Sequence, residues 1–201
     1  MKLVILDRDG TINEDRDDYV KSADEWLPVP GALEAIARLN HAGWHTVIAT
    51  NQSGLARGLF DMAALNAIHA RMNRELAEVG GRIDAVFFCP HGPDDGCRCR
   101  KPLPGLFETI GERYGVDLAE AHLVGDSLSD LLAGASVGCK LHFVRTGKGA
   151  RLDEAEIVAV QSAVPGARIH ADLAAFAHDL LHDERIQRGD AAEPDSVFGA
   201  L

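Results

Sequence analysis

The chain has 201 residues, of which 46% are hydrophobic and 25% charged, and its formal net charge is −11. A chain of this length folds as about one domain and buries enough surface to need no disulfide framework. The acidic balance argues against a general nucleic-acid-binding protein, which needs a basic surface to neutralise phosphates. A small phosphorylated ligand remains open, because a local basic cluster is enough to bind one.

The N-terminal apolar run, Leu3 to Leu6, ends at Asp7. It is too short for a membrane-spanning helix, which needs about 20 apolar residues, and too short for the core of a signal peptide. We therefore expect a cytoplasmic protein that does not associate with membranes. Because the sequence shows no exposed apolar stripe, we also expect a monomer.

Short apolar runs alternate with helical patterns along the chain. The runs typical of strands buried on both faces of a sheet are Leu3–Leu6, Thr46–Ala49, Ala85–Phe88, His122–Val124 and Leu141–Val144. Between them we expect helices over residues 30–41, 61–79, 104–114 and 127–137. This order predicts an α/β fold with a doubly wound, mostly parallel sheet.

A weaker helix–strand–helix pattern covers residues 151–182, and the residues after it are polar. We therefore expect one domain over residues 1–182 and a polar C-terminal tail over residues 183–201.

Polar clusters follow the ends of the expected strands, where parallel sheets bind their ligands. Asp7 and Asp9 follow the first strand, and Asp126 and Asp130 follow the fourth. Each cluster alone is also compatible with a solvated turn or a helix cap. Together the carboxylates would repel one another unless a cation lies between them. Oxygen ligands select a hard metal, most simply Mg²⁺.

Two further segments complete this pattern. Thr50 to Ser53 follow the second strand and offer hydroxyls, amides and backbone N–H groups, although they are also compatible with a capping turn. Arg98, Arg100 and Lys101 crowd into four residues, either as a solvated patch or as positive charge for a phosphate. A hard cation, a free carboxylate, a lysine and a hydroxyl describe a phosphoryl-transfer site. The sequence has no Walker A pattern, which disfavours a P-loop kinase.

The loop at residues 89–99 carries a compact group of soft ligands. Cys89 and His91 are followed by Cys97 and Cys99, a donor set that suits a tetrahedral, structural Zn²⁺. The alternative is a core Cys89, two surface thiols and an unrelated histidine. Such a zinc would order a loop without helix or strand and would place Arg100 and Lys101 directly after its last ligand.

The order of these motifs resembles the haloacid dehalogenase superfamily of phosphohydrolases over about residues 3–145. The resemblance implies that Asp7 attacks phosphorus and becomes an aspartyl-phosphate. It implies that Asp9 protonates the leaving oxygen and later activates water. Thr50 would hold a phosphoryl oxygen, and Lys101 would neutralise the nucleophile and the transferring group.

The same resemblance implies a Mg²⁺ site made by Asp7, the backbone carbonyl of Asp9 and Asp126. Asp130 would not bind the metal itself but would orient these ligands. No insertion in the sequence is large enough for a separate cap domain.

Among members with a zinc loop, the heptose bisphosphate phosphatases and the histidinol-phosphate phosphatases come closest. The segment Thr50–Gly58 resembles the heptose group, since the histidinol group typically has an acid after Asn-Gln and lacks Ala-Arg-Gly. The resemblance implies removal of the 7-phosphate of D-glycero-D-manno-heptose 1,7-bisphosphate, on the route to nucleotide-activated heptose for lipopolysaccharide. Histidinol-phosphate phosphatase is the alternative. One departure is the short loop between His91 and Cys97.

A bisphosphate substrate brings a second phosphate that needs a cation, and Arg100 has the planar geometry that suits it. The residues expected to contact the substrate are Asn51, Gln52, Ser53, Arg57, Arg100, Asp15, Asp18 and Tyr19. Arg57 is equally compatible with an ordinary surface position, and the acidic segment 15–19 with a solvated hairpin tip. A zinc-stabilised binding module without catalysis is a third hypothesis, disfavoured by the intact acid and lysine set.

Overall fold

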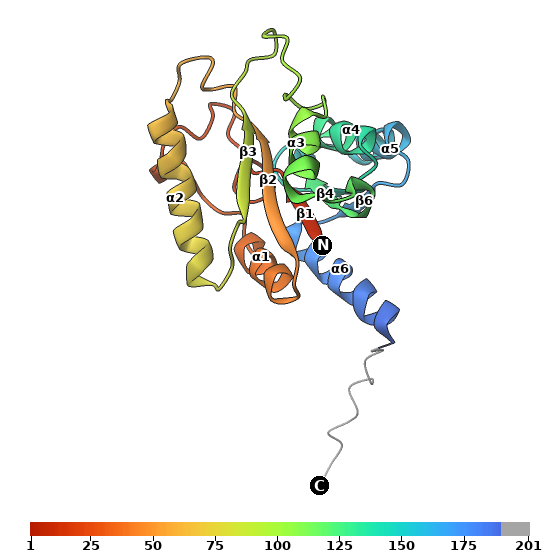
Figure 1. Ribbon diagram of the computed structural model, residues 1–201. Coiled ribbons are helices and arrows are strands. Elements are labelled where there is room, and N and C mark those ends of the chain that lie inside the picture. The colour runs from red at the N-terminus through yellow and green to blue at the C-terminus, as the bar shows by residue number, and fades with distance from the viewer. Residues whose placement is uncertain (190–201) are drawn as a thin grey trace.

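The computed structural model describes residues 1–189, and a single parallel sheet forms its centre (Figure 1). The strands lie in the order β3-β2-β1-β4-β5-β6, and every neighbouring pair is parallel. Their bounds are β1 Leu3–Leu6, β2 His45–Asn51, β3 Ala85–Cys89, β4 His122–Gly125, β5 Lys140–Val144 and β6 Arg168–His170. The predicted doubly wound α/β fold is confirmed.

Helices cover both faces of the sheet. One face packs against α1 (Ala32–His41), α2 (Met62–Glu78) and α6 (Leu173–Arg188), and the other against α3 (Gly105–Tyr114), α4 (Leu128–Ser136) and α5 (Glu154–Ala163). Side chains along β1 alternate between the two cores. Val4 and Leu6 pack toward the first face, and Leu3 and Ile5 toward the second. This alternation explains why the whole strand is apolar, since both of its sides are buried.

Helix α6 ends at Arg188, later than the end near residue 182 that the sequence predicts. Residues 183–188 form the last turns of this helix. Glu184 ties the helix to the first strands, because its carboxylate lies 2.6 Å from Lys2 Nζ and accepts a 3.3 Å hydrogen bond from Trp44 Nε1. Gly189 closes the helix in a left-handed conformation with φ of 79°. The rest of the expected tail, residues 190–201, lies outside the described residues.

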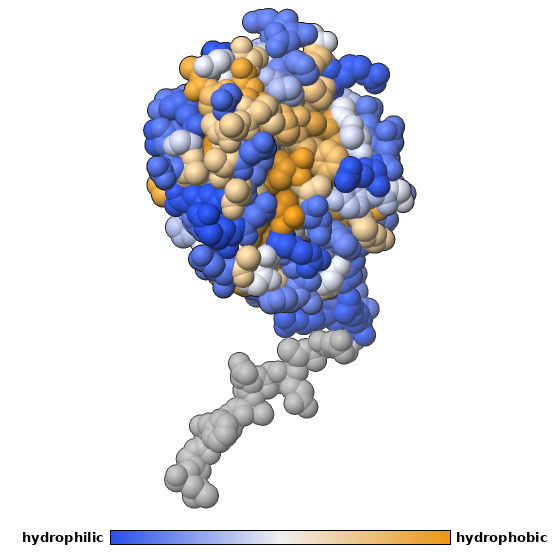
Figure 2. Space-filling view, turned by 60° about the vertical axis from the view of Figure 1, so that its left-hand side comes forward, coloured by the Kyte–Doolittle hydropathy of each residue, from blue (hydrophilic) through white to orange (hydrophobic). Residues whose placement is uncertain are grey.

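The surface is mostly hydrophilic on the side that carries α2, with an apolar strip near its middle (Figure 2). Large hydrophobic side chains that remain exposed include Leu27, Leu59 and Met62. Within residues 1–189, no helix is both long enough and apolar enough to cross a membrane. The expected monomer stays a prediction.

Candidate active site

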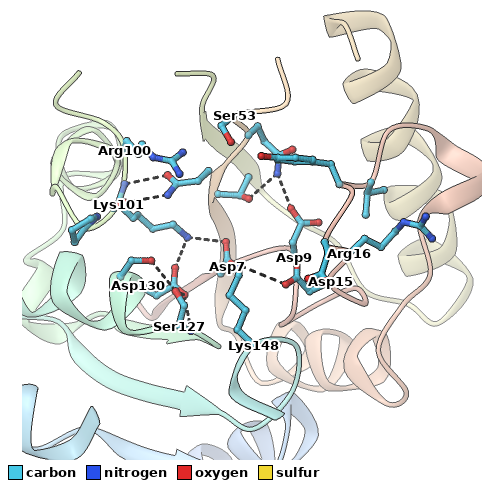
Figure 3. Close-up of a pocket in the computed structure, with 18 residues that line it drawn as sticks. Asp7, Asp9, Asp15, Arg16, Ser53, Arg100, Lys101, Ser127, Asp130 and Lys148 are labelled. Atoms are coloured by element: carbon cyan, nitrogen blue, oxygen red, sulfur yellow. Dashed lines mark hydrogen bonds and ion pairs between the residues drawn. The ribbon is translucent and has the colours of Figure 1, made fainter. Parts of the chain in front are cut away.

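A cavity of about 580 Å³ opens at the carboxyl end of the sheet (Figure 3). Its walls come from the ends of β1 and β2, the start of α4, the loops after β3 and β5, and a flap at residues 14–27. Because the strands are parallel, polar residues that are far apart in sequence meet at this one edge.

Asp7 lies at the base of this cavity, directly after β1. Lys101 Nζ donates a 2.7 Å hydrogen bond to Asp7 Oδ1 and forms an ion pair with Asp130. Burial raises the pKa of Asp7 to about 6, against the opposing charge of Lys101. Burial alone would lower the pKa of Lys101, but the carboxylates of Asp130 and Asp7 raise it, so the ammonium is permanently charged.

A second carboxylate, Asp126, stands beside Asp7 at the end of β4. Oxygen atoms of Asp7, Asp126 and Asp130 lie within 4.8 Å of one another. Burial raises the pKa of Asp126 to about 8, and the charges of Asp7 and Asp130 add to this effect. Among the described residues, Asp126 Oδ1 is buried without a hydrogen-bond partner. A hard divalent cation fits this group, because it would bind that oxygen and relieve the repulsion.

The carboxylate of Asp9 lies outside the metal-sized group of acids. It accepts hydrogen bonds from Arg8 at 2.8 and 2.9 Å, from Asn13 at 2.9 Å and from Gln52 at 2.8 Å. Burial alone would raise the pKa of Asp9, but the charge of Arg8 and these hydrogen bonds lower it below the usual value. Arg8 is fully buried and also donates to His69 Nε2 at 3.2 Å. In this arrangement Asp9 is an ionised acceptor.

The end of β2 and the two residues after it line the cavity. Thr50 Oγ1 accepts a 3.0 Å hydrogen bond from Gln52 Nε2, and Ser53 stands at the rim. Asn51 joins two loops, since its side chain accepts from Lys101 N at 3.1 Å and donates to Lys101 O at 3.2 Å. These two hydrogen bonds hold the backbone of Lys101, whose side chain reaches Asp7.

The other residues expected to contact a substrate divide into two groups. Asp15, Tyr19 and Arg100 line the cavity. Asp18 is exposed outside the lining and pairs with Arg16 and Lys21, and the guanidinium of Arg57 lies 5.9 Å from the ring of Tyr19 rather than in the cavity.

The predicted soft-ligand group is assembled beside the cavity. Cys89 ends β3, and ligand atoms of Cys89, His91, Cys97 and Cys99 lie within 4.8 Å of one another. The thiols are free, with Cys99 Sγ at 3.2 Å and Cys97 Sγ at 3.6 Å from Cys89 Sγ. Three sulfurs and one imidazole nitrogen at this spacing fit a tetrahedral Zn²⁺. Cys139 is buried elsewhere, in the core.

Lys148, which the sequence reasoning did not select, also lines the cavity from the loop after β5. Arg16 lines the cavity as well, from the segment 15–19. The Lys148 backbone N–H donates a 2.6 Å hydrogen bond to Asp126 Oδ2, and Thr146 Oγ1 donates at 2.6 Å to Gly10 O. The sequence contained a signal for Lys148, because residues 145–149 follow a predicted strand just as the other segments of the site do.

Comparison with known proteins identifies the family to which the chain belongs. A family model described as "HAD-hyrolase-like" matches residues 98–175. D-glycero-beta-D-manno-heptose-1,7-bisphosphate 7-phosphatase of Bordetella bronchiseptica is 58% identical over 91% of this chain and 99% of the relative. The enzyme of that name from Pseudomonas aeruginosa is 53% identical over 89% of this chain and 97% of its own length. This chain belongs to the heptose-1,7-bisphosphate 7-phosphatase family.

Solved structures of heptose-1,7-bisphosphate phosphatases agree with this assignment. The Bordetella bronchiseptica enzyme, crystallised with magnesium and phosphate, has a TM-score of 0.85 and covers 91% of this chain and 99% of its own. The Burkholderia thailandensis enzyme is 49% identical with a TM-score of 0.68, covering 90% and 99%. The expected haloacid dehalogenase resemblance is therefore confirmed, and the heptose bisphosphatase group is supported over the histidinol group.

Proposed function

We propose that this protein is a Mg²⁺-dependent phosphatase that removes the 7-phosphate of D-glycero-β-D-manno-heptose 1,7-bisphosphate. The observation that carries the proposal is the contact of Lys101 with Asp7 and Asp130, beside the unpartnered oxygen of Asp126. The names of the relatives supply the substrate and its β anomer. The product, a heptose 1-phosphate, suits the synthesis of nucleotide-activated heptose.

In the first step, the Asp7 carboxylate attacks phosphorus and the bond between phosphorus and the sugar oxygen breaks. Lys101 neutralises the charge between Asp7 and the phosphoryl group, and Thr50 donates to a phosphoryl oxygen. Asp9 gives its proton to the leaving oxygen. In the second step, water attacks the aspartyl-phosphate, Asp9 takes the proton, and phosphate leaves Asp7.

Asp9 must therefore bind a proton before the first step. The hydrogen bonds from Arg8, Asn13 and Gln52 stabilise its ionised form, which is the form needed as the base of the second step. We propose that substrate binding replaces some of these donors and lets Asp9 hold the proton.

The metal ions have separate roles in this proposal. Asp7, Asp126 and the Asp9 carbonyl would hold Mg²⁺, which supplies positive charge to the phosphoryl group. Asp130 positions Lys101 and is close enough to assist in holding the metal. Zn²⁺ at Cys89, His91, Cys97 and Cys99 would order the loop before Arg100. We also propose a cytoplasmic monomer, because a small diffusible sugar phosphate needs no partner to deliver it.

The test measures phosphate release with Mg²⁺ from the β and α heptose bisphosphates and from histidinol phosphate. We expect the highest kcat/KM for the β anomer, and preference for histidinol phosphate would contradict the proposal. Asp7→Asn removes the nucleophile and should lower kcat at least about 10³-fold. Its thermal unfolding should remain cooperative, and retained turnover in the folded variant would refute Asp7 as nucleophile.

A further inference from the structure

Lys148 reaches into the cavity from the loop after β5, although the proposed chemistry gives its side chain no role. Figure 3 shows this side chain extending between Asp7 and Asp15. Its Nζ lies 3.5 Å from Asp15 Oδ2, and 59% of the side chain is exposed. The backbone of Lys148 is fixed independently by its hydrogen bond to Asp126 Oδ2. The ammonium is therefore free to move on an anchored stem.

The charges at the base of the cavity leave a place for one more cation. The carboxylates there are those of Asp7, Asp9, Asp126 and Asp130, and the basic groups among them are Arg8 and Lys101. Two negative charges remain, which a divalent metal would balance. The proton that Asp9 must bind before the first step adds one positive charge, so a phosphate dianion would still bring one negative charge that these groups do not compensate. Uncompensated charge is costly in a low-dielectric site.

The other basic side chains of the lining are less suited to provide that charge. Arg16 is held by Asp18 in two hydrogen bonds of 3.0 Å, and Arg100 donates at 3.3 Å to His91 O, beside the zinc-ligand loop. In Figure 3, the side chain of Lys148 extends toward Asp7. Its 3.5 Å separation from Asp15 is too long for a strong hydrogen bond, so changing partners costs little.

We propose that Lys148 is a substrate-binding residue whose ammonium leaves Asp15 and donates to an oxygen of the phosphate that lies over Asp7. This inference rests on the proposed phosphatase function and names a further residue for it. The exchange has a second consequence. Once Lys148 has moved, the Asp15 carboxylate is free to accept hydrogen bonds from sugar hydroxyls. Binding of the phosphate by Lys148 therefore favours binding of the sugar by the flap.

The test measures binding of inorganic phosphate, the common product of any phosphatase, in the presence of Mg²⁺ by calorimetry. Lys148→Gln should weaken phosphate binding about 10-fold, because a charge-assisted hydrogen bond is lost. Lys148→Arg should restore binding to within about threefold, since it keeps the charge and the donors. Substitution should leave folding intact, because the side chain is exposed and the backbone bond to Asp126 needs no particular side chain.

Arg151→Gln is the matched control. Arg151 pairs with Asp17 of the flap at 2.7 Å, much as Lys148 pairs with Asp15, but it does not line the cavity. The control should bind phosphate within about twofold of the wild type. Wild-type affinity in Lys148→Gln would overturn the proposal, and so would equal losses in both variants, which would assign the effect to the flap ion pairs. If the wild-type enzyme instead prefers another phosphate ester to the heptose bisphosphate, the proposed substrate is refuted, but the role of Lys148 in phosphate binding is not.

Discussion

At the scale of single residues, the position of Asp126 depends on two glycines. Gly10 and Gly147 pack against its carboxylate so closely that a Cβ on either would collide with Asp126 Oδ2. Gly10 also has φ of 87°, a conformation that L side chains rarely adopt. Asp9 and Gly10 therefore have different roles. Asp9 is the proposed acid and base, and Gly10 leaves space for the carboxylate of Asp126.

We predict that Gly10→Ala lowers both stability and activity. The left-handed backbone should cost about 1–2 kcal/mol of unfolding free energy. The methyl group should also displace Asp126 and raise the Mg²⁺ concentration needed for half-maximal activity. Urea unfolding and a Mg²⁺ titration of turnover measure the two effects.

Gly43→Ala provides the control for this prediction. Gly43 has φ of 84°, but a Cβ there would meet no atom within 4 Å. It should lose a similar amount of stability while keeping the wild-type Mg²⁺ dependence. Equal Mg²⁺ dependence in all three proteins would show that Asp126 does not need the space at Gly10.

At the scale of elements, the loop after β3 has no helix or strand to fix it. Its soft ligands begin at Cys89, the last residue of β3, and end at Cys99, directly before Arg100 and Lys101. Arg100 donates to the carbonyl of His91, which is itself in the ligand group. A metal bound here would therefore position the two basic residues that face the cavity.

We predict that Cys99→Ser abolishes stoichiometric zinc binding. We also expect weaker substrate binding, because Arg100 and Lys101 directly follow the lost ligand. Purified wild-type protein should contain about one zinc per chain by elemental analysis, and the variant much less. KM should rise about 10-fold or more, because the loop no longer holds Arg100 in place.

Cys139→Ser is the comparison, since this thiol is buried in the core away from the ligand group. Its zinc content and KM should stay at wild-type values, although some stability is lost. Zinc retained in Cys99→Ser, or absent from the wild type, would refute the ligand assignment.

At the scale of the whole molecule, the sequence was most informative where chemistry follows directly after a strand. Asp7, Asp126 and Lys101 could be grouped because parallel strands deliver their ends to one edge. The donors around Asp9 were not predicted. Arg8 and Asn13 are close to Asp9 in sequence, but Gln52 reaches it only through tertiary folding. The same holds for the ion pair of Lys148 with the flap.

The far part of the sheet carries a row of histidines whose pairing the sequence did not indicate. His142 and His170 are buried, and His122 is half-buried. His122 Nδ1 lies 2.8 Å from His142 Nε2, and His142 Nδ1 lies 3.0 Å from His170 Nε2. His170 Nδ1 in turn lies 3.1 Å from Asp179 Oδ2 on α6. The row joins β4, β5 and β6 beneath Phe176. With His170 donating to Asp179, each neutral ring can donate from Nδ1 and accept at Nε2, so every contact in the row is satisfied by neutral rings.

This row should make the stability of the whole domain sensitive to acid. Burial lowers the pKa of His142 to about 2, helped by His122 and His170, and burial with Lys140 and Arg168 lowers that of His122 to about 4. In the unfolded chain these groups titrate near 6.5. Their contribution to stability is therefore complete above pH 6.5 and is lost as the pH falls below it, because the unfolded state then binds more protons.

We predict that His142→Gln, which keeps a donor and an acceptor but does not titrate, reduces this acid sensitivity. Between pH 6.5 and 5, the wild type should lose about 1.6 kcal/mol more unfolding free energy than the variant, because the slope rises from half its limit at pH 6.5 to about 1.4 kcal/mol per pH unit. Urea unfolding at several pH values measures the difference. His182→Gln, at an exposed position on α6, controls for removal of a surface histidine. Parallel pH profiles for the wild type and His142→Gln would contradict the neutral row, since a charged His142 in the folded protein would leave no proton to be taken up on unfolding.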